Sequence, residues 1–260
     1  MNQSTVNMLW VGNALGRIEL LSIASWLAHG HRIRLHSYEP LTGIPDGVEV
    51  VDGERTVPRA QLMHLRHRKS GSYALGANYF RYRLQQNGAG LWSDLDVVCL
   101  KPIQIAGDCV FGLEDDETIN NAVLYLKQGL PLIDELTGLF KDNYTPPWTR
   151  RGRARKLRLK RLLGLRFSPG DLPWGTYGPQ ALTHLARKHG LFGLAQARHV
   201  FYPLGYKQAQ LAFDPAFSLD SVLKENTLTL HLWNEMLREL RHTQPPAGSP
   251  LSRLYAQFGI

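Results

Sequence analysis

Two carboxylates interrupt an otherwise apolar stretch of this 260-residue chain. Residues 91–100, "LWSDLDVVCL", are rich in Val and Leu and follow the glycines of residues 88–90, a composition that predicts a buried strand. Asp94 and Asp96 stand two positions apart in it, so on a strand both side chains point to one face. Removing an unpaired charge from water is costly. The spacing therefore predicts a partner for this pair of carboxylates.

A divalent cation suits these two carboxylates, because like charges a few ångströms apart repel unless a proton or a cation lies between them. Oxygen ligands select Mg²⁺ or Mn²⁺, and such an ion would bridge to the phosphates of a nucleotide. His231, in the predicted strand "TLTLHLW", is a candidate third ligand that suits Mn²⁺ better than Mg²⁺. Two alternatives stay open. Asp94 caps a turn while Asp96 pairs with a nearby Arg, or His231 is a hydrogen-bonded core residue.

Hydrophobic periodicity predicts the elements that must position these residues. We expect strands at residues 6–11, 32–38, 48–51, 91–100, 110–113, 122–126 and 227–233. We expect helices at residues 16–29, 58–67, 73–86, 131–140 and 179–188. Alternating strands and helices predict an α/β fold, with a mostly parallel sheet and helices on both faces. Such sheets bind ligands at the carboxyl ends of their strands, where the strand order reverses. We predict one domain over residues 1–260, with a basic irregular or helical insertion around residues 143–173.

Composition places the chain among folded proteins with polyanionic partners. It is 43% hydrophobic and 20% charged, and its net charge of +8 favours nucleic acid, anionic lipid or phosphorylated substrates. Its apolar runs are shorter than the roughly 20 residues that cross a bilayer. The polar N-terminus, residues 1–7, does not resemble a secretion signal. Cys99 and Cys109 lack metal-type spacing, so we expect reduced thiols in a cytoplasmic protein.

The positive charge is concentrated in one segment. Between Arg150 and Arg166 the chain holds nine basic residues and no acidic one, interspersed with leucines. A cationic amphipathic helix lies on anionic membrane surfaces, where each basic residue contributes ~1 kcal/mol. We therefore expect attachment to the inner face of the cell membrane, and no nucleic-acid partner. A solvated disordered loop and RNA binding are the alternatives.

A longer pattern surrounds the two carboxylates. Residues 73–103, "YALGANYFRYRLQQNGAGLWSDLDVVCLKPI", resemble the signature of the DXD-type sugar-binding glycosyltransferases with the GT-A fold. That family includes α-galactosyl- and mannosyltransferases and the glucosylating toxins of clostridia. The positions that fit its pattern are Arg81, Tyr82, Leu84, Gly88, Gly90, Trp92, Asp94, Asp96, Leu100, Lys101 and Pro102. The segments "INNAVLYLKQGLPLIDEL", "TYGPQALTHL" and "LHLWNEMLRE" resemble later parts of the family in the same order. Asn78 replaces a family Asp that holds sugar hydroxyls, and Asn still donates and accepts hydrogen bonds.

The resemblance implies a GT-A-like, Rossmann-type fold and a metal-dependent hexosyltransferase using Mn²⁺ or Mg²⁺. The donor would be a UDP-sugar (UDP-galactose, UDP-glucose or UDP-N-acetylglucosamine), and the acceptor a saccharide or lipid-linked saccharide. It implies retention of anomeric configuration and a role in bacterial cell-surface polysaccharide synthesis. The expected metal ligands are Asp94, Asp96 and His231, and the expected catalytic residues are Arg81, Asp94 and Asp96. The expected donor-binding residues are Trp10, Asn78, Arg81, Trp92, Asp94, Asn121 and Trp233.

Several of these residues also have their own physical rationale. Trp10 ends a predicted strand, where an indole could stack on uracil, and Trp233 could offer its indole N–H to a diphosphate. Asn120 and Asn121 form an uncommon polar pair at the start of a strand. For each residue the alternative is structural: core packing for the two tryptophans and a simple turn for the asparagines. For Arg81 the alternative is a polar helix surface on which it pairs with Asp94 or Asp96.

Three other functions remain open from the sequence. A sugar nucleotidyltransferase would use a Gly-rich loop after the first strand, of which residues 12–17, "GNALGR", are a weak version. A non-catalytic basic protein would bind RNA or membranes through residues 150–166. A protein with Asn78 in place of Asp could bind a sugar nucleotide without transferring the sugar.

Overall fold

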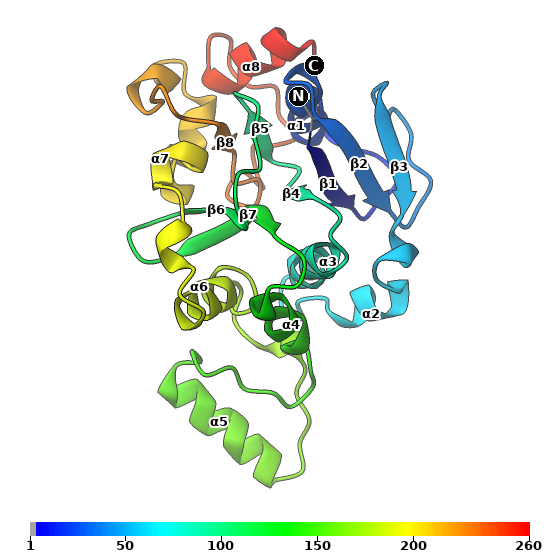
Figure 1. The fold of residues 1–260 in the computed structure, drawn as a ribbon. Coiled ribbons are helices and arrows are strands. Elements are labelled where there is room, and N and C mark those ends of the chain that lie inside the picture. The colour runs from blue at the N-terminus through cyan, green and yellow to red at the C-terminus, as the bar shows by residue number, and fades with distance from the viewer. Residues whose placement is uncertain (1–3) are drawn as a thin grey trace.

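A six-stranded sheet forms the centre of the protein, in the order β3-β2-β1-β4-β7-β6 (Figure 1). The computed structural model describes residues 4–260, so residues 1–3 of the polar N-terminus lie outside the described residues. The strands of this sheet are β1 (Thr5–Trp10), β2 (Arg32–Ser37), β3 (Val48–Asp52), β4 (Leu91–Ser93), β6 (Cys109–Leu113) and β7 (Ile119–Leu126). A second, two-stranded sheet pairs β5 (Val97–Cys99) with β8 (Thr229–His231).

Eight α-helices surround the sheets in the described part of the chain. They are α1 (Arg17–Ala28), α2 (Arg59–His64), α3 (Ala74–Gln86), α4 (Pro131–Gly138), α5 (Arg151–Leu162), α6 (Pro179–Lys188), α7 (Arg198–Phe201) and α8 (Pro250–Phe258). Short 3-10 segments lie at Gly53–Arg55, Pro169–Asp171, Phe192–Leu194, Tyr206–Phe213 and Leu219–Ser221.

The strand order creates a reversal beside β1. The chain moves outward from β1 through β2 to β3, and then β4 returns to the opposite side of β1. Strands β1, β2, β3 and β4 are parallel, whereas β7 is antiparallel to both β4 and β6. The switch point therefore lies between the carboxyl ends of β1 and β4, where open α/β sheets bind ligands. Trp10 ends β1 there, and Asp94 directly follows β4.

Apolar side chains fill both faces of the sheet. Because strand side chains alternate, Leu91 of β4 joins the core next to α1 and α8, while its neighbour Trp92 joins the core next to α3 and α6. Val123 and Leu124 of β7 divide in the same way. Helices thus cover both faces, which confirms the predicted α/β fold with a mostly parallel sheet.

Two predicted strands differ from the structure, and one helix of the structure was not predicted. The single strand expected at residues 91–100 is two strands, β4 and β5, joined by a turn at Asp94–Asp96 and belonging to different sheets. The strand expected at residues 227–233 is shorter, because Trp233 has a left-handed φ of 56° that ends the extended backbone. Helix α8 was not predicted, although Ser249 caps it and Pro250 begins it.

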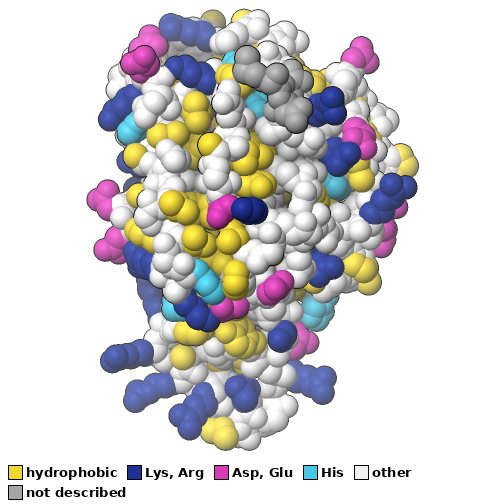
Figure 2. All heavy atoms as spheres, in the orientation of Figure 1, with side chains coloured by type: hydrophobic (Ala, Val, Ile, Leu, Met, Phe, Trp, Pro, Cys, Tyr) yellow, Lys and Arg dark blue, Asp and Glu magenta, His cyan; other side chains and the backbone are white. Residues whose placement is uncertain are grey.

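The basic insertion contains a helix that protrudes from the body (Figure 1). Helix α5 is made of good helix formers and ends before Gly164, whose φ of 71° closes it. Only Leu157 is buried within α5. Figure 2 shows Lys and Arg side chains spread around this end of the molecule. In residues 4–260, no helix has the length and apolarity to cross a membrane.

Candidate functional site

Asp94, Asp96 and His231 converge at the switch point of the sheet. Each offers one ligand atom, and these three atoms lie within 4.8 Å of one another. We expected the two aspartates to point to one face of a continuous strand, but they lie in a turn between two strands. The pairing of β5 with β8 sets Val97 opposite His231 and so brings the imidazole to the turn. The cluster is therefore assembled from two distant segments of the chain.

Asp96 is held by the segment around His231. Its Oδ1 lies 3.2 Å from His231 Nε2, and its Oδ2 accepts a hydrogen bond of 2.8 Å from the backbone N–H of Asn234. Burial by itself would raise the pKa of Asp96, but the charge and hydrogen bond of His231 outweigh it and lower that pKa. Burial would lower the pKa of His231, but the charge of Asp96 outweighs it and raises that pKa. Without a bound cation, the two groups therefore form an ion pair.

Asp94 is held from the opposite side by helix α3. The guanidinium of Arg81 lies 2.9 Å from Asp94 Oδ1, and the indole N–H of Trp92 donates to the same oxygen at 2.8 Å. Arg81 also donates to the backbone carbonyls of Asn121 and Ala77, and its guanidinium lies 4.8 Å from the centre of the Trp92 ring. The Asp94 side chain keeps 28% of its surface exposed, and that of Asp96 keeps 15%. Both carboxylates thus have fixed orientations and an open side.

Two asparagines from different elements meet beside Arg81. Asn121 of β7 donates to the side-chain oxygen of Asn78 at 2.9 Å and to the hydroxyl of Tyr82 at 3.2 Å. Asn120 instead donates to Glu114 at 2.6 Å and accepts from the backbone N–H of Ala122, which is the turn-like role of the structural alternative. The structure therefore brings Asn78 and Asn121 together with Arg81, and it turns Asn120 toward the β6–β7 connection.

Two of the three tryptophans expected to bind the donor, Trp92 and Trp233, do not present their indole N–H groups to a ligand. Trp92 is 1% exposed, so its role is to orient Asp94. Trp233 stacks on His231 with ring centres 3.9 Å apart and donates its indole N–H to the carbonyl of Leu204, so that N–H is not available to a diphosphate. Trp10 is half-buried at the end of β1, and its indole N–H is buried without a partner among residues 4–260. Of the three, Trp10 keeps a position from which a base could be contacted.

Two residues at the site were not predicted. Glu19 lies in the first turn of α1, where the helix dipole favours a carboxylate, and it accepts a 2.8 Å hydrogen bond from the Asn234 side chain. Burial raises the pKa of Glu19. Gly16 makes room for this carboxylate, since a Cβ at Gly16 would lie 2.5 Å from Glu19 Oε2. Asn234 could have been found from its place just after the His-x-Trp segment. Glu19 could not, because nothing in the pattern of its helix distinguishes it from an ordinary polar helix residue.

The donor set fits a divalent cation. Two carboxylates and one imidazole suit Mn²⁺, and opposite ligands of an octahedral ion at about 2.1 Å each lie about 4 Å apart. The three atoms within 4.8 Å therefore need only a small inward shift. Nδ1 of His231 is buried without a hydrogen-bond partner in the described residues. A metal would replace the proton that His231 carries in its ion pair with Asp96.

The loop after β1 does not resemble a phosphate cradle. The backbone N–H of Gly12 donates to the Glu39 carboxylate at 3.3 Å. Arg17 donates to the side chain of Gln244 and to the carbonyl of Ile260, and its guanidinium lies 4.1 Å from the centre of the Tyr255 ring. The groups that a nucleotidyltransferase would aim at phosphates are therefore engaged elsewhere.

The chain was compared with family models, curated proteins and solved structures. The chain matches no family model, and no curated protein matches it. Among solved structures it is similar to one titled "PaToxG Glycosyltransferase", with 14% sequence identity and a TM-score of 0.45. That similarity covers 72% of this chain and 69% of the other.

Proposed function

We propose that this protein is a metal-dependent glycosyltransferase that moves a hexose from a UDP-sugar to a saccharide or lipid-linked acceptor. The observation that carries the proposal is the cluster of Asp94, Asp96 and His231 at the switch point of a mostly parallel sheet. It is supported by the pattern of residues 73–103, because Arg81 and Trp92 of that pattern both contact Asp94.

The proposal gives each polar residue a task. Asp94, Asp96 and His231 hold the ion, which when bound stabilises negative charge on a leaving diphosphate. Arg81 keeps Asp94 in its orientation through the contact of 2.9 Å, and the Asn234 N–H does the same for Asp96. Asn78 and Asn121 form a pair of amides that binds sugar hydroxyls. Half-buried Trp10 provides a surface for uracil.

The carboxylates are ion ligands in this proposal and do not act as an acid and base pair. Asp96 is already engaged by His231 and Asn234, and retention proceeds by same-face attack in which the leaving phosphate takes the acceptor proton. The bound donor and acceptor would have to cover the open side of the carboxylates to exclude water, so that the donor is not simply hydrolysed. No nucleophilic side chain is required.

The wider assignment concerns place and pathway. We place the protein at the cytoplasmic side of the cell membrane, attached through the basic residues of α5, where it extends bacterial cell-surface polysaccharide on lipid-linked acceptors. The nine basic residues and absence of acidic residues between Arg150 and Arg166 support this placement.

Calorimetry with UDP tests the central proposal. We expect UDP binding in the presence of Mn²⁺, loss of that binding in EDTA, and loss of it in Asp96→Asn. Asp46→Asn is the matched control, because Asp46 is an exposed carboxylate in the turn before β3. A panel of UDP- and GDP-sugars with Mn²⁺ then identifies the donor by release of nucleoside diphosphate.

Two results would contradict the proposal. Mn²⁺-independent UDP binding, unchanged in Asp96→Asn, would remove the ion site. Release of pyrophosphate from a nucleoside triphosphate would instead identify a nucleotidyltransferase.

A further inference from the structure

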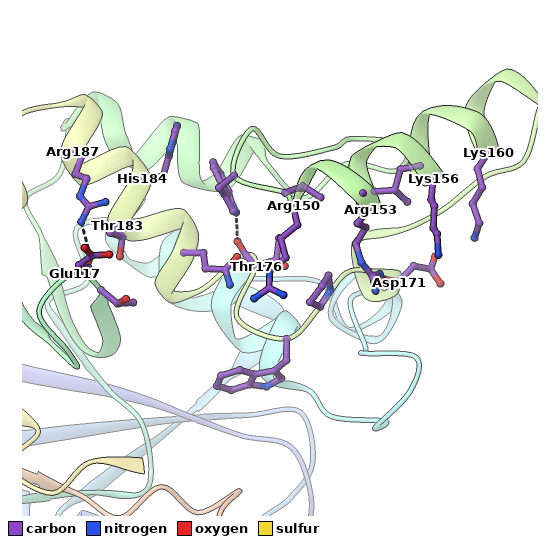
Figure 3. Close-up of a pocket in the computed structure, with 18 residues that line it drawn as sticks. Glu117, Arg150, Arg153, Lys156, Lys160, Asp171, Thr176, Thr183, His184 and Arg187 are labelled. Carbon is purple, nitrogen blue, oxygen red and sulfur yellow. Dashed lines mark hydrogen bonds between the residues drawn. The ribbon is translucent and has the colours of Figure 1, made fainter. Parts of the chain in front are cut away.

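A wide groove separates the protruding helix α5 from the body of the protein (Figure 3). Its volume is about 1170 Å³, which is large enough for a ligand of several sugar units. It extends from the β6–β7 connection, at Glu117 and Thr118, past α6 to the far end of α5. None of the residues assigned to the metal cluster lines it.

One wall of the groove is a row of cations. Arg150, Arg153, Lys156 and Lys160 recur at intervals of three and four residues, so they share one face of the helix. Figure 3 shows Arg153, Lys156 and Lys160 projecting from α5 in the same direction. Within residues 4–260, none of the four forms a salt bridge, and the nearby Asp171 carboxylate pairs with Arg68 at 3.4 Å. Arg153 donates a hydrogen bond of 3.3 Å to the backbone carbonyl of Asp171. Unpaired cations on the wall of a groove favour an anionic ligand.

The opposite wall adds hydrogen-bonding and aromatic groups. Trp148 stacks on His184 with ring centres 4.8 Å apart and donates its indole N–H to the carbonyl of Thr176 at 2.8 Å. The indole of Trp174 lines the groove and is 60% exposed. Aromatic surface next to a few polar groups is typical of sites for small organic ligands. The groove therefore suits an anion that is attached to a larger, less polar body.

A smaller pocket, with a volume of about 20 Å³, adjoins the groove on the side of Asn78. Trp174 and Thr176 line both cavities, and Asn78 lines the smaller one. Asn78 accepts a hydrogen bond from Asn121, whose backbone carbonyl accepts from Arg81. The residues shared by the two cavities thus connect the groove with Asn78 and the polar residues beside Asp94.

We propose that this groove binds the phosphate or diphosphate group of an anionic acceptor, on the side of the molecule where Trp174 and Thr176 adjoin Asn78. The inference rests on the proposed glycosyltransferase function and names the chemical class of its acceptor. Phosphate oxygens accept charge-assisted hydrogen bonds from Lys and Arg, which are stronger than neutral ones. The phosphate is carried either by a lipid or by a soluble sugar phosphate.

Inorganic pyrophosphate is the probe. Calorimetry in EDTA keeps the metal cluster without an ion, so it reports on the groove alone. We expect wild-type binding, weakened about tenfold or more in Lys156→Ala/Lys160→Ala, because two charge-assisted contacts are lost. The matched control is Arg155→Ala/Arg158→Ala, which removes the same charge from exposed positions of α5 that do not line the groove. We expect less than about a threefold change there.

Vesicles containing phosphatidylglycerol then identify the source of the phosphate. If pyrophosphate displaces the protein from these vesicles, the groove takes lipid-borne phosphate. If pyrophosphate binds without displacing it, the groove takes a soluble phosphate and the rest of α5 contacts the membrane. Both results support the groove as the anion site.

Other results overturn the inference. Equal weakening by the two double substitutions, or no pyrophosphate binding while vesicles or single-stranded RNA still bind, would reduce α5 to a diffuse charged surface. A different pair of results would show that the proposed function fails while the groove still binds anions. In that case Mn²⁺-dependent UDP binding is absent while pyrophosphate binding in EDTA keeps its dependence on Lys156 and Lys160.

Discussion

The metal cluster and helix α5 use charge in opposite ways. In the cluster, each carboxylate has a fixed partner: Arg81 for Asp94 and His231 for Asp96, at 2.9 and 3.2 Å. On α5 the basic side chains point into solvent or into the groove, and the four that line the groove form no salt bridge among the described residues. Buried, paired charges give geometry that salt hardly changes, whereas exposed charges act at longer range and are screened.

Under the proposed function, this contrast assigns two different roles to two regions of one chain. Fixed charges suit a step that needs ligands at set positions, because preorganised groups need no rearrangement when the ligand arrives. Exposed lysines and arginines suit capture of a bulky anion whose contacts vary. We therefore expect perturbations of the cluster to change chemistry and perturbations of α5 to change affinity.

The strongest test of this contrast removes one partner from inside the cluster. His231→Gln should lower turnover by about three orders of magnitude, because an ion ligand and the partner of Asp96 are lost together. Steady-state kinetics with a UDP-sugar and saturating Mn²⁺ measures this effect. His184→Gln, in the groove, is the control and should change turnover by less than about tenfold. Equal losses in the two variants would contradict the contrast.

A second test measures how stability depends on pH. We expect this dependence to come from buried titratable groups and not from the exposed basic residues of α5. Burial lowers the pKa of His36 to about 4, and its Nε2 lies 3.0 Å from the Asn7 side-chain oxygen. The unfolded chain takes up this proton near pH 6.5, before the folded protein does. Stability is therefore complete above about pH 6.5 and declines as the pH falls toward 4, by about 3 kcal/mol in all.

Urea unfolding at a series of pH values measures this loss. His36→Gln should flatten the dependence between pH 6.5 and 4, whereas Arg155→Ala/Arg158→Ala should leave it unchanged. A wild-type slope that His36→Gln does not alter would assign the effect to other groups.

The third test measures what the Arg81–Asp94 ion pair contributes to stability when no cation is bound. Arg81→Gln removes the partner of Asp94 and the donor to the Asn121 carbonyl. Because Asp94 is partly exposed, we expect a loss of about 2 kcal/mol in the free energy of unfolding, less than for a fully buried pair. Chemical denaturation measures it. Arg83→Gln on the same helix should cost less than about 0.5 kcal/mol, and a similar cost for both would contradict the assigned role.

The smallest expected effect concerns the tip of α5. Leu162 is 76% exposed there, beside the exposed Leu159 and Leu163. Leu162→Ser should weaken sedimentation with phosphatidylglycerol vesicles by about fivefold, because partial burial of one leucine contributes about 1 kcal/mol. Leu194→Ser, at a position 49% exposed elsewhere on the surface, is the control. Vesicle binding that resists both Leu162→Ser and high salt would refute a peripheral membrane role for α5.

Much of the fold followed from local patterns. The period-2 and period-3.6 segments predicted β1, β2, α1 and α3 because their apolar faces pack directly on the sheet. The prediction of one strand at residues 91–100 was wrong, because two buried strands joined by a short turn have the same composition as one buried strand. Helix α8 carried readable signals in Ser249, Pro250 and Gly259.

The candidate site was predictable by residue type but not by contact. Asp94, Asp96 and His231 were named from the sequence, yet their meeting depends on the pairing of β5 with β8, across more than half the chain. Glu19 belongs to an ordinary helical pattern, and its approach to Asn234 is a tertiary event. The burial of Trp92 and the bond from Trp233 to Leu204 likewise depend on packing that periodicity does not encode.

The reversed direction of β7 has an evolutionary consequence. Strand β7 runs opposite to its neighbours β4 and β6, so those two strands bring their carboxyl ends to the edge of the sheet that holds the switch point, and β7 brings its beginning. The β6–β7 hairpin therefore lies at the same edge. Residues 114–118 of that hairpin can change length or composition without disturbing the ladder opposite Ser93. Selection could therefore change what this edge of the sheet accepts by editing one short hairpin, while Asp94, Asp96 and His231 stay as they are.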